Sequence, residues 1–270
     1  MKKLLVPTDF SENARNALAY AIEIANLFGS HIQLLHTYKL PRKSGMFISV
    51  DRYMMEEIRP DMDKWEKWTR EQLRNGASVD SSILRDHTVL AIARMAEEDE
   101  IDLIVMGTQG ASGLKEVFMG SNTGAVLQQA GIPLLAIPSD FTFRPVQIIV
   151  LAVDDLDISS HQIVAPLTQL ARSFDAKVMV YHLEKELEEA GVDPSVDIFL
   201  DGVEHSFHYE LERKELNQSI NAFVLENKAD MLCMIRRPRG FFERFFRTSV
   251  TRKKVFSSPV PLLALLERKG

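Results

Sequence analysis

The chain has 270 residues, 46% of them hydrophobic and 26% charged, and its 38 acidic and 32 basic side chains give a formal net charge of −6. This composition is that of an ordinary globular protein, so it excludes a disordered, collagenous or fibrous chain. The negative charge argues against a surface that binds nucleic acid over the whole protein. At about 150 residues per domain, the length predicts two domains or one large one.

The compartment is predicted from segments that the sequence lacks. The apolar run after Lys2 and Lys3 has only three residues before Pro7, too few for a signal peptide. No uncharged stretch approaches the roughly 18 residues of a membrane span. The single cysteine, Cys233, cannot form an internal disulfide, and no cysteine and histidine cluster has zinc-site spacing. We therefore expect a cytoplasmic protein without a transmembrane segment.

Strands and helices alternate along the first half of the chain. Short apolar runs predict strands at residues 3–8, 31–37, 78–84, 101–106 and 134–137. Apolar residues spaced three and four apart predict helices between them, one from an N-cap at Ser11 to a stop at Gly29 and others at residues 51–75, 89–98 and 121–129. This order predicts an α/β fold with a parallel sheet and helices on both faces.

The second half repeats the first. A shift of 128 residues lays residues 102–137 over 230–265, and nine of the 36 pairs are identical, against about two expected by chance. Nearer the start of each half the offset is about 145 or 146, which aligns His36 with His182, two predicted core histidines with satisfied hydrogen bonds. We therefore predict two domains, 1–140 and 146–270, with strands in the second at residues 148–153, 177–183, 204–211, 231–235 and 262–266.

A glycine-rich loop follows the predicted strand at residues 101–106. Because Gly107, Gly110 and Gly120 have no Cβ, backbone amides there can approach an anion, and residues 121–123 open a helix whose free N–H groups attract phosphate. The one lysine of the loop, Lys115, is not in the position of a Walker A motif, and residues 7–11 lack the glycines of a dinucleotide fingerprint. The pattern predicts a polyphosphate site, with a tight structural turn as the alternative.

The spacing Gly107-x2-Gly110-x9-Gly120-Ser121 resembles that of the universal stress protein family. The resemblance extends to four further segments: Pro7-Thr8-Asp9 followed by Ser11, Leu34-Leu35-His36, the run 102–107, and Ile132-Pro133-Leu134-Leu135. These segments cover nearly all of the first half and, more weakly, the second, so the chain resembles a tandem universal stress protein of the UspA-like kind. The resemblance implies two tandem doubly wound domains, each a five-stranded parallel sheet of strand order 3-2-1-4-5.

The resemblance also implies an ATP site at the switch between the first and fourth strands. The residues that would contact adenine and ribose are Pro7, Thr8, Asp9 and Thr37, with Asp9 accepting hydrogen bonds from the ribose hydroxyls or the base. Those that would cover ribose and the α-phosphate are Met106, Gly107 and Gly110. Those that would hold the β- and γ-phosphates are Gly120, Ser121, Asn122 and Thr123, and Mg²⁺ would accompany the phosphates. From the residues alone, Asp9 has an alternative role as the N-cap of the following helix.

The second copy departs from this pattern at the glycines. Ile235, Pro238 and Thr248 stand at the positions of Gly107, Gly110 and Gly120, so we predict one nucleotide per chain, bound by the first copy. In the family, the last strands of two domains pair across a dimer axis. Here residues 134–137 and 262–266 are predicted to pair within one chain as a pseudo-dimer, which would cover two sheet edges.

Two classes of function fit these observations. The first is an ATP-binding stress-response protein whose bound state regulates an unidentified protein partner. The second is a structural or adaptor protein without a ligand that acts through its surface and the segment 236–254, where eight Lys and Arg side chains accompany one acid, Glu243. ATP hydrolysis is at most weak, because no motif places a base or an arginine at the phosphates. No catalytic or metal-ligating residue is predicted, and homodimerisation of tandem chains is left open.

Overall fold

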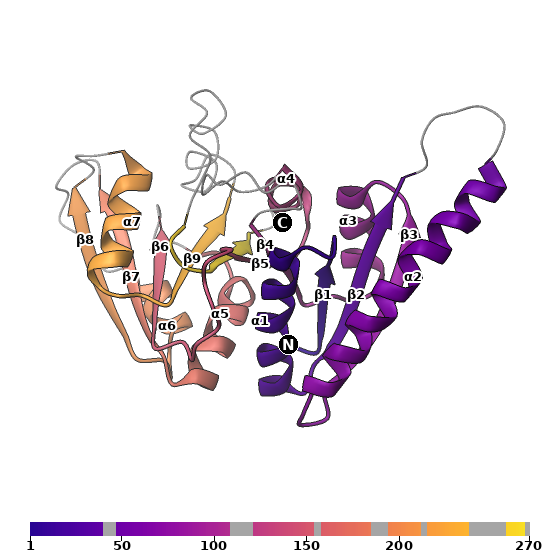
Figure 1. Ribbon diagram of the computed structural model, residues 1–270. Coiled ribbons are helices and arrows are strands. Elements are labelled where there is room, and N and C mark those ends of the chain that lie inside the picture. The colour runs from indigo at the N-terminus through magenta and orange to yellow at the C-terminus, as the bar shows by residue number, and fades with distance from the viewer. Residues whose placement is uncertain are drawn as a thin grey trace. The chain divides into compact units, whose positions relative to one another are not determined.

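The computed structural model describes residues 1–39, 47–108, 121–153, 158–184, 194–211, 215–237 and 258–267. These residues form two compact units (Figure 1). Unit 1 contains the described residues up to 108 together with 121–132, and unit 2 contains those from 133 onward. The domain ranges 1–140 and 146–270 stay a prediction.

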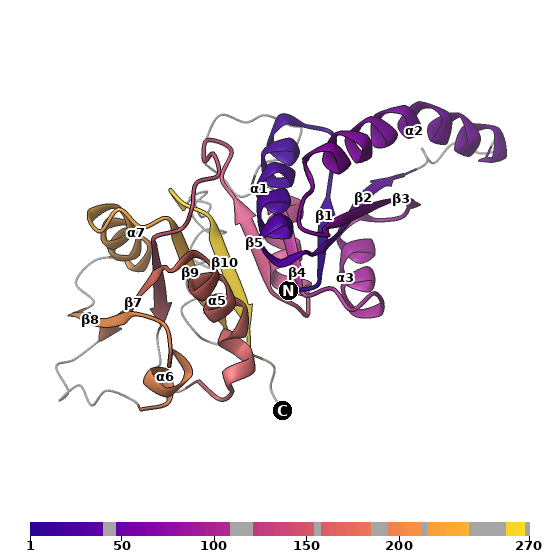
Figure 2. The same cartoon turned by 90° about the horizontal axis from the view of Figure 1, so that it is seen from below.

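Unit 1 alternates strands and helices in the predicted order. Its described strands are all parallel, lie in the spatial order β3-β2-β1-β4, and are β1 (Lys3–Pro7), β2 (His31–Tyr38), β3 (Ser78–Arg85) and β4 (Leu103–Gly107). Its described helices are α1 (Glu12–Phe28), α2 (Phe47–Gln72), α3 (Thr88–Glu98) and α4 (Ser121–Gln129). Figure 2 shows α1 and α2 on one face of the strands and α3 on the other, as a doubly wound fold requires.

A single residue marks each end of α1, Ser11 at its start and Gly29 at its end. Ser11 is the N-cap, because its side chain accepts a hydrogen bond from the backbone N–H of Ala14 at 3.2 Å. Gly29 ends the helix with φ of 64°, a left-handed conformation that favours glycine. The helix predicted at residues 51–75 is α2, which begins four residues earlier at Phe47 and ends three residues earlier at Gln72. Asn75, the last residue of the predicted helix, has a positive φ of 54° and is therefore not helical.

Unit 2 contains the second copy and the last strand of the first. Its described strands are β5 (Leu134–Ile137), β6 (Ile148–Val153), β7 (Lys177–Glu184), β8 (His205–Leu211), β9 (Met231–Arg236) and β10 (Leu262–Leu266). Its described helices are α5 (His161–Phe174), α6 (Pro194–Phe199) and α7 (Leu216–Glu226). The strands lie in the order β5-β10-β9-β6-β7-β8, and all neighbours are parallel except β5 and β10.

This topology confirms the predicted fold class. In the second copy the order β8-β7-β6-β9-β10 is 3-2-1-4-5, and in the first copy β3-β2-β1-β4 supplies its first four places. The predicted pairing of the two last strands is also confirmed. β5 runs antiparallel to β10, with Leu135 opposite Leu263 in the register. Both strands are almost completely buried.

An aspartate at the same place in each copy ties the fourth strand to the first. In unit 1, Asp102 Oδ2 accepts hydrogen bonds from the backbone N–H groups of Lys2 and Lys3 at 2.5 and 3.0 Å. Asp102 and Asp230 are the first of the nine identical pairs between the copies. The repeated aspartate therefore has a structural role.

The aspartate of unit 2 is the more buried of the two. Asp230 Oδ2 accepts from the backbone N–H groups of Gln147 and Ile148 at 2.8 and 3.1 Å. Its other oxygen, Oδ1, lies 2.8 Å from Nε of Arg144. Asp230 is 7% exposed, so these three donors replace water around its carboxylate.

The core of each unit lies between its strands and helices. The interior residues of the central strands are apolar and buried, as in Leu4, Leu5 and Val6 of β1, and Cys233 of β9 is buried as well. Among the described residues, no helix combines the length and the hydropathy needed to cross a membrane.

Candidate functional site

The predicted nucleotide residues lie at the carboxyl edge of unit 1, where the strand order reverses. β1 pairs with β2 on one side and with β4 on the other, and Leu4 and Leu5 lie opposite Leu103 and Ile104. The chain therefore leaves β1 and β4 at neighbouring points of the sheet, and the next described helices are α1 and α4. In open parallel sheets this switch point is where ligands bind.

The loop after β1 is held by its own short hydrogen bonds. Pro7 and Thr8 are buried, and Thr8 N–H donates to the carbonyl of Leu35 at 2.8 Å. The hydroxyl oxygen of Thr8 accepts from the backbone N–H of Phe10 at 3.0 Å. Asp9 is exposed, and its Oδ1 accepts from the backbone N–H of Ser11 at 3.1 Å. The alternative role of Asp9 as the helix N-cap is wrong, because Ser11 is the N-cap.

The end of β2 contacts this loop through His36. Its Nδ1 lies 2.7 Å from the carbonyl oxygen of Thr8, so the predicted satisfied histidine is confirmed, although its ring is half-buried rather than buried. The ring of Phe10 stacks on that of His36 and meets Trp65 of α2 edge-on. Burial lowers the pKa of His36, and the Thr8 hydrogen bond and the charge of Asp9 oppose that shift.

Thr37 also lies near the carboxyl end of β2, next to His36. Its hydroxyl is half-buried and lies 2.7 Å from the hydroxyl of Thr88, the first residue of α3. The bond joins β2 to α3, so part of the hydrogen-bonding capacity of Thr37 is used within the protein.

The end of β4 packs tightly against α1. Met106 is buried, and a Cβ added to Gly107 would lie 3.0 Å from the carbonyl oxygen of Asn13, in the first turn of α1. The approach of a helix therefore favours glycine at residue 107, because a larger residue would make the backbone of Asn13 shift, independently of any ligand. Gly110 and Gly120 lie outside the described residues.

The first turn of α4 is attached to β4 by a hydroxyl group. Thr123 is 4% exposed, and its Oγ1 donates to the carbonyl of Gly107 at 2.7 Å. The single hydroxyl proton of Thr123 is therefore bound to the protein. Ser121 and Asn122 are exposed on the same turn, and they supply the accessible polar side chains of the helix N-terminus.

The described structure adds residues that the sequence reasoning missed. Phe10 and Trp65 pack on His36, Asn13 limits residue 107, and Thr88 holds Thr37. An aromatic residue directly after Asp9 was the one visible signal. The other contacts join residues far apart in the sequence, so no local pattern indicates them.

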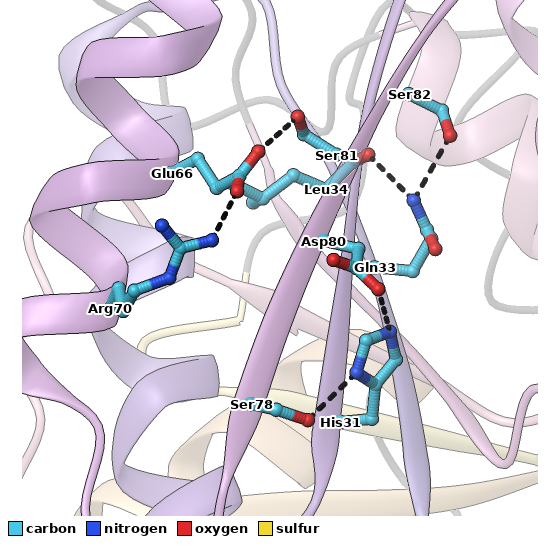
Figure 3. A network of polar contacts seen from close by, with 9 residues as sticks. All are labelled: His31, Gln33, Leu34, Glu66, Arg70, Ser78, Asp80, Ser81 and Ser82. Atoms are coloured by element: carbon cyan, nitrogen blue, oxygen red, sulfur yellow. Dashed lines mark hydrogen bonds and ion pairs between the residues drawn. The ribbon is translucent and has the colours of Figure 1, made fainter.

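A second polar network lies along β2, β3 and α2 (Figure 3). His31 Nδ1 lies 2.9 Å from Ser78 Oγ, and its Nε2 lies 3.8 Å from a carboxylate oxygen of Asp80. On α2, Glu66 bonds Ser81 and Arg70, each at 2.5 Å. These contacts join the edge strand β3 to its neighbours. Within the described part of the chain, no group of three or more His, Cys, Asp or Glu side chains is suited to hold a metal ion.

The corresponding edge of unit 2 is built differently. Ile235, at the position of Gly107, is 4% exposed, whereas Pro238, Thr248 and most of the basic segment 236–254 lie outside the described residues. After β9, Nε of Arg237 lies 2.8 Å from Glu267, which follows β10. The other oxygen of Glu267 accepts from Ser159, from its hydroxyl at 2.6 Å and its N–H at 3.1 Å.

The comparisons with known proteins match segments in both copies of the repeat. A sequence model of the universal stress protein family matches residues 1–138 and 183–265. Universal stress protein MJ0531 of Methanocaldococcus jannaschii is 29% identical over 142 residues, which are 50% of this chain and 81% of that protein. Universal stress protein MJ0577 of the same organism is 28% identical over 153 residues, which are 50% of this chain and 94% of that protein.

Several solved structures match almost the whole chain. Among them is the crystal structure of a universal stress protein from Archaeoglobus fulgidus, which is 20% identical, with a TM-score of 0.72. The match covers 97% of this chain and 95% of that one. This likeness shows the fold of the chain.

Proposed function

Since the chain belongs to the universal stress protein family, we propose that unit 1 binds one nucleotide of the ATP class at the carboxyl edge of β1 and β4. The observation that supports this most is the bond from Thr123 to Gly107, which holds the first turn of α4 at the end of β4. Asp9 follows the neighbouring strand β1 and is exposed. An acceptor suited to hydroxyl groups and a helix N-terminus suited to phosphates thus follow adjacent strands.

Each predicted contact has a role in this proposal. Pro7 and Thr8 form the floor beneath the base and ribose, Thr37 lines the adenine pocket, and Asp9 accepts from the ribose hydroxyls or the base. Met106, Gly107 and Gly110 cover the ribose and α-phosphate. Gly120, Ser121 and Asn122 hold the outer phosphates with Mg²⁺, and Thr123 contributes by anchoring their helix.

In this proposal the chain has a single nucleotide site, which lies in unit 1. In unit 2, a buried isoleucine replaces Gly107, and the arginine that follows β9 pairs with Glu267. The isoleucine side chain fills space that the first copy leaves to the backbone, and the ion pair with Glu267 balances a positive charge that could otherwise attract a phosphate. The second copy then contributes by packing rather than by binding.

We propose that the binding of the nucleotide, rather than its hydrolysis, is the regulatory signal. The described residues at the edge of unit 1 offer acceptors and a helix N-terminus, and no group there is poised to activate water. We therefore propose a regulatory role in the stress response, in which the bound nucleotide changes the loops that a protein partner contacts.

Two measurements test the proposal: the number of nucleotides bound per chain, and the ATP affinities of a matched pair of variants. Nucleotide released on denaturing the gently purified protein is quantified by chromatography, and calorimetric titrations follow with ATP, ADP and AMP, each with and without Mg²⁺. We expect one ATP per chain. Two per chain would contradict the single site, and no copurified nucleotide together with no binding in any titration would overturn the proposal.

Asp9→Asn keeps the side-chain oxygen that accepts a hydrogen bond from Ser11 and removes the negative charge, so it should weaken the affinity for ATP at least tenfold. The control, Asp80→Asn, neutralises an exposed carboxylate on β3 of the same unit and should leave the affinity unchanged. Equal ATP affinities of the two variants would show that the charge of Asp9 does not contribute to nucleotide binding.

A further inference from the structure

We propose that Phe10 and His36 are positioning residues of the nucleotide site, which hold residues 8–11 in the conformation that directs Asp9. The inference rests on the proposed function, because it concerns the same loop. Neither residue is among the predicted contacts. Each acts on them through the backbone.

The backbone of the loop needs such support. Phe10 has φ of 61°, in the left-handed region that side chains other than glycine rarely adopt. A residue in this conformation persists when surrounding contacts outweigh its cost, and such residues concentrate at functional sites. Phe10 directly follows Asp9, so its conformation sets the path of the chain that leaves the carboxylate.

The ring of Phe10 supplies the first of these contacts. It stacks on the ring of His36 with 4.5 Å between centroids and 23° between planes. It also meets Trp65 at 5.6 Å and 78°, an edge-to-face arrangement. Both geometries are favourable for aromatic pairs. The side chain is thus packed between β2 and α2.

His36 supplies the second contact, on the other side of Asp9. A backbone carbonyl only accepts, so Nδ1 of His36 carries the hydrogen that it donates to Thr8 at 2.7 Å. Burial lowers the pKa of His36, which favours the neutral ring. The carbonyl of Thr8 and the ring of Phe10 are therefore both bound to one imidazole, and Asp9 lies between them in the chain.

Unit 2 provides a natural comparison. His182 is aligned with His36 and keeps the bond to the backbone, with Nδ1 3.1 Å from the carbonyl oxygen of Val153. Its ring meets Tyr209 of β8 at 6.1 Å and 77°, an edge contact with a strand. The positions aligned with Phe10, residues 155 and 156, lie outside the described residues. The histidine is thus common to both copies. The stack of Phe10 on His36 is a described feature of unit 1.

The test separates the two contacts by substitution. Phe10→Leu removes the stack, and His36→Ala removes both the stack and the hydrogen bond. His36→Asn keeps a side-chain N–H group at the position of Nδ1 without the ring. We expect ATP to bind about five- to tenfold more weakly to Phe10→Leu and His36→Ala. His36→Asn should regain part of the loss, and the unit 2 control His182→Asn should bind as the unmodified protein does.

A second measurement reports on the loop without nucleotide. The chain has two tryptophans, and Trp68→Phe leaves Trp65 as the sole one, beside Phe10. Adding Phe10→Leu to this variant should raise the quenching of Trp65 fluorescence by acrylamide, while circular dichroism remains that of the folded protein.

The outcomes separate this inference from the function on which it rests. If the unmodified protein binds no nucleotide, the proposed function and this inference fall together. If it binds ATP and both Phe10→Leu and His36→Ala bind it equally well, the inference is overturned and the site stands. Unchanged quenching of Trp65 in the Phe10→Leu variant would also overturn it, because the ring would then not pack as described.

Discussion

Replacing Asp230 by alanine should destabilise unit 2 far more than the matching change at Asp102 destabilises unit 1. Both carboxylates accept two backbone N–H groups at the start of the first strand of their copy. They differ in burial, since Asp230 is 7% exposed and Asp102 is exposed. Arg144 also lies 2.8 Å from Asp230.

The magnitude follows from what each substitution leaves behind. Asp230→Ala leaves two N–H groups without their acceptor at a place that water reaches poorly, whereas the Arg144 side chain is 55% exposed and can be solvated, so the cost is about 2–4 kcal/mol. Asp102→Ala leaves its two donors open to water, so the cost is about 1 kcal/mol. For a unit of this size, the change at Asp230 should lower the melting temperature by roughly 6–15 °C.

The assay must report on each unit by itself. The two tryptophans, Trp65 and Trp68, both lie in α2, so tryptophan fluorescence in urea follows unit 1. Unit 2 is followed by calorimetry and far-ultraviolet circular dichroism. Asp230→Asn keeps an acceptor without the charge and should fall between the wild type and Asp230→Ala.

Equal losses at Asp102 and Asp230 would refute this reasoning, because burial and Arg144 would then add nothing. A loss below about 1 kcal/mol at Asp230 would do the same, since it would mean that water satisfies the abandoned donors.

Three further changes test the contacts at the carboxyl edges. Thr123→Val removes the hydroxyl that donates to Gly107 and should cost about 1–2 kcal/mol in urea unfolding, whereas Thr123→Ser should cost less; equal losses would assign the effect to packing. Burial lowers the pKa of His36 from 6.5, so the unfolded state takes up a proton at a higher pH than the folded state does. The stability of unit 1 should therefore fall as the pH drops below about 6.5, and His36→Asn should reduce this pH dependence. An unchanged pH dependence in His36→Asn would exclude His36 as its source. Burial would raise the pKa of Glu267, but the Ser159 hydrogen bonds and Arg237 together hold it below 4.5. Glu267→Gln should therefore cost about 2 kcal/mol at pH 7, and its difference from the wild type in calorimetry should shrink below pH 4.5; a constant difference would rule out the ionised carboxylate as the cause.

Much of the fold could be predicted because its signals are local. The apolar strands, the N-cap Ser11 and the stop at Gly29 each depend on a few neighbouring residues. The strand order 3-2-1-4-5 was implied by the resemblance to the universal stress protein family, and the repeat indicated that the second half has the same order. The ends of α2 were harder to predict, because no capping residue directly precedes Phe47 in the sequence and nothing in the sequence indicates the positive φ of Asn75, which lies beyond the end of the helix.

The candidate site was predictable in its position more than in its chemistry. The switch point follows from strand order, but the use of each hydroxyl depends on partners distant in the chain. Thr123 and Ser121 look equivalent in the sequence, yet one hydroxyl is buried against Gly107 and the other side chain is exposed. The same holds for Gly107, whose need for a missing Cβ arises from Asn13 on a helix about ninety residues earlier.

The antiparallel pairing of β5 with β10 has a consequence for how the two copies evolve. Two separate chains that meet through their last strands associate only as far as their concentration allows, whereas strands of a single polypeptide face each other at a fixed effective concentration. Because the two copies are joined, a substitution in one is no longer reproduced in the other. The two halves can therefore carry different residues at matching positions, as Gly107 and Ile235 show, which a symmetric pair of identical subunits does not permit.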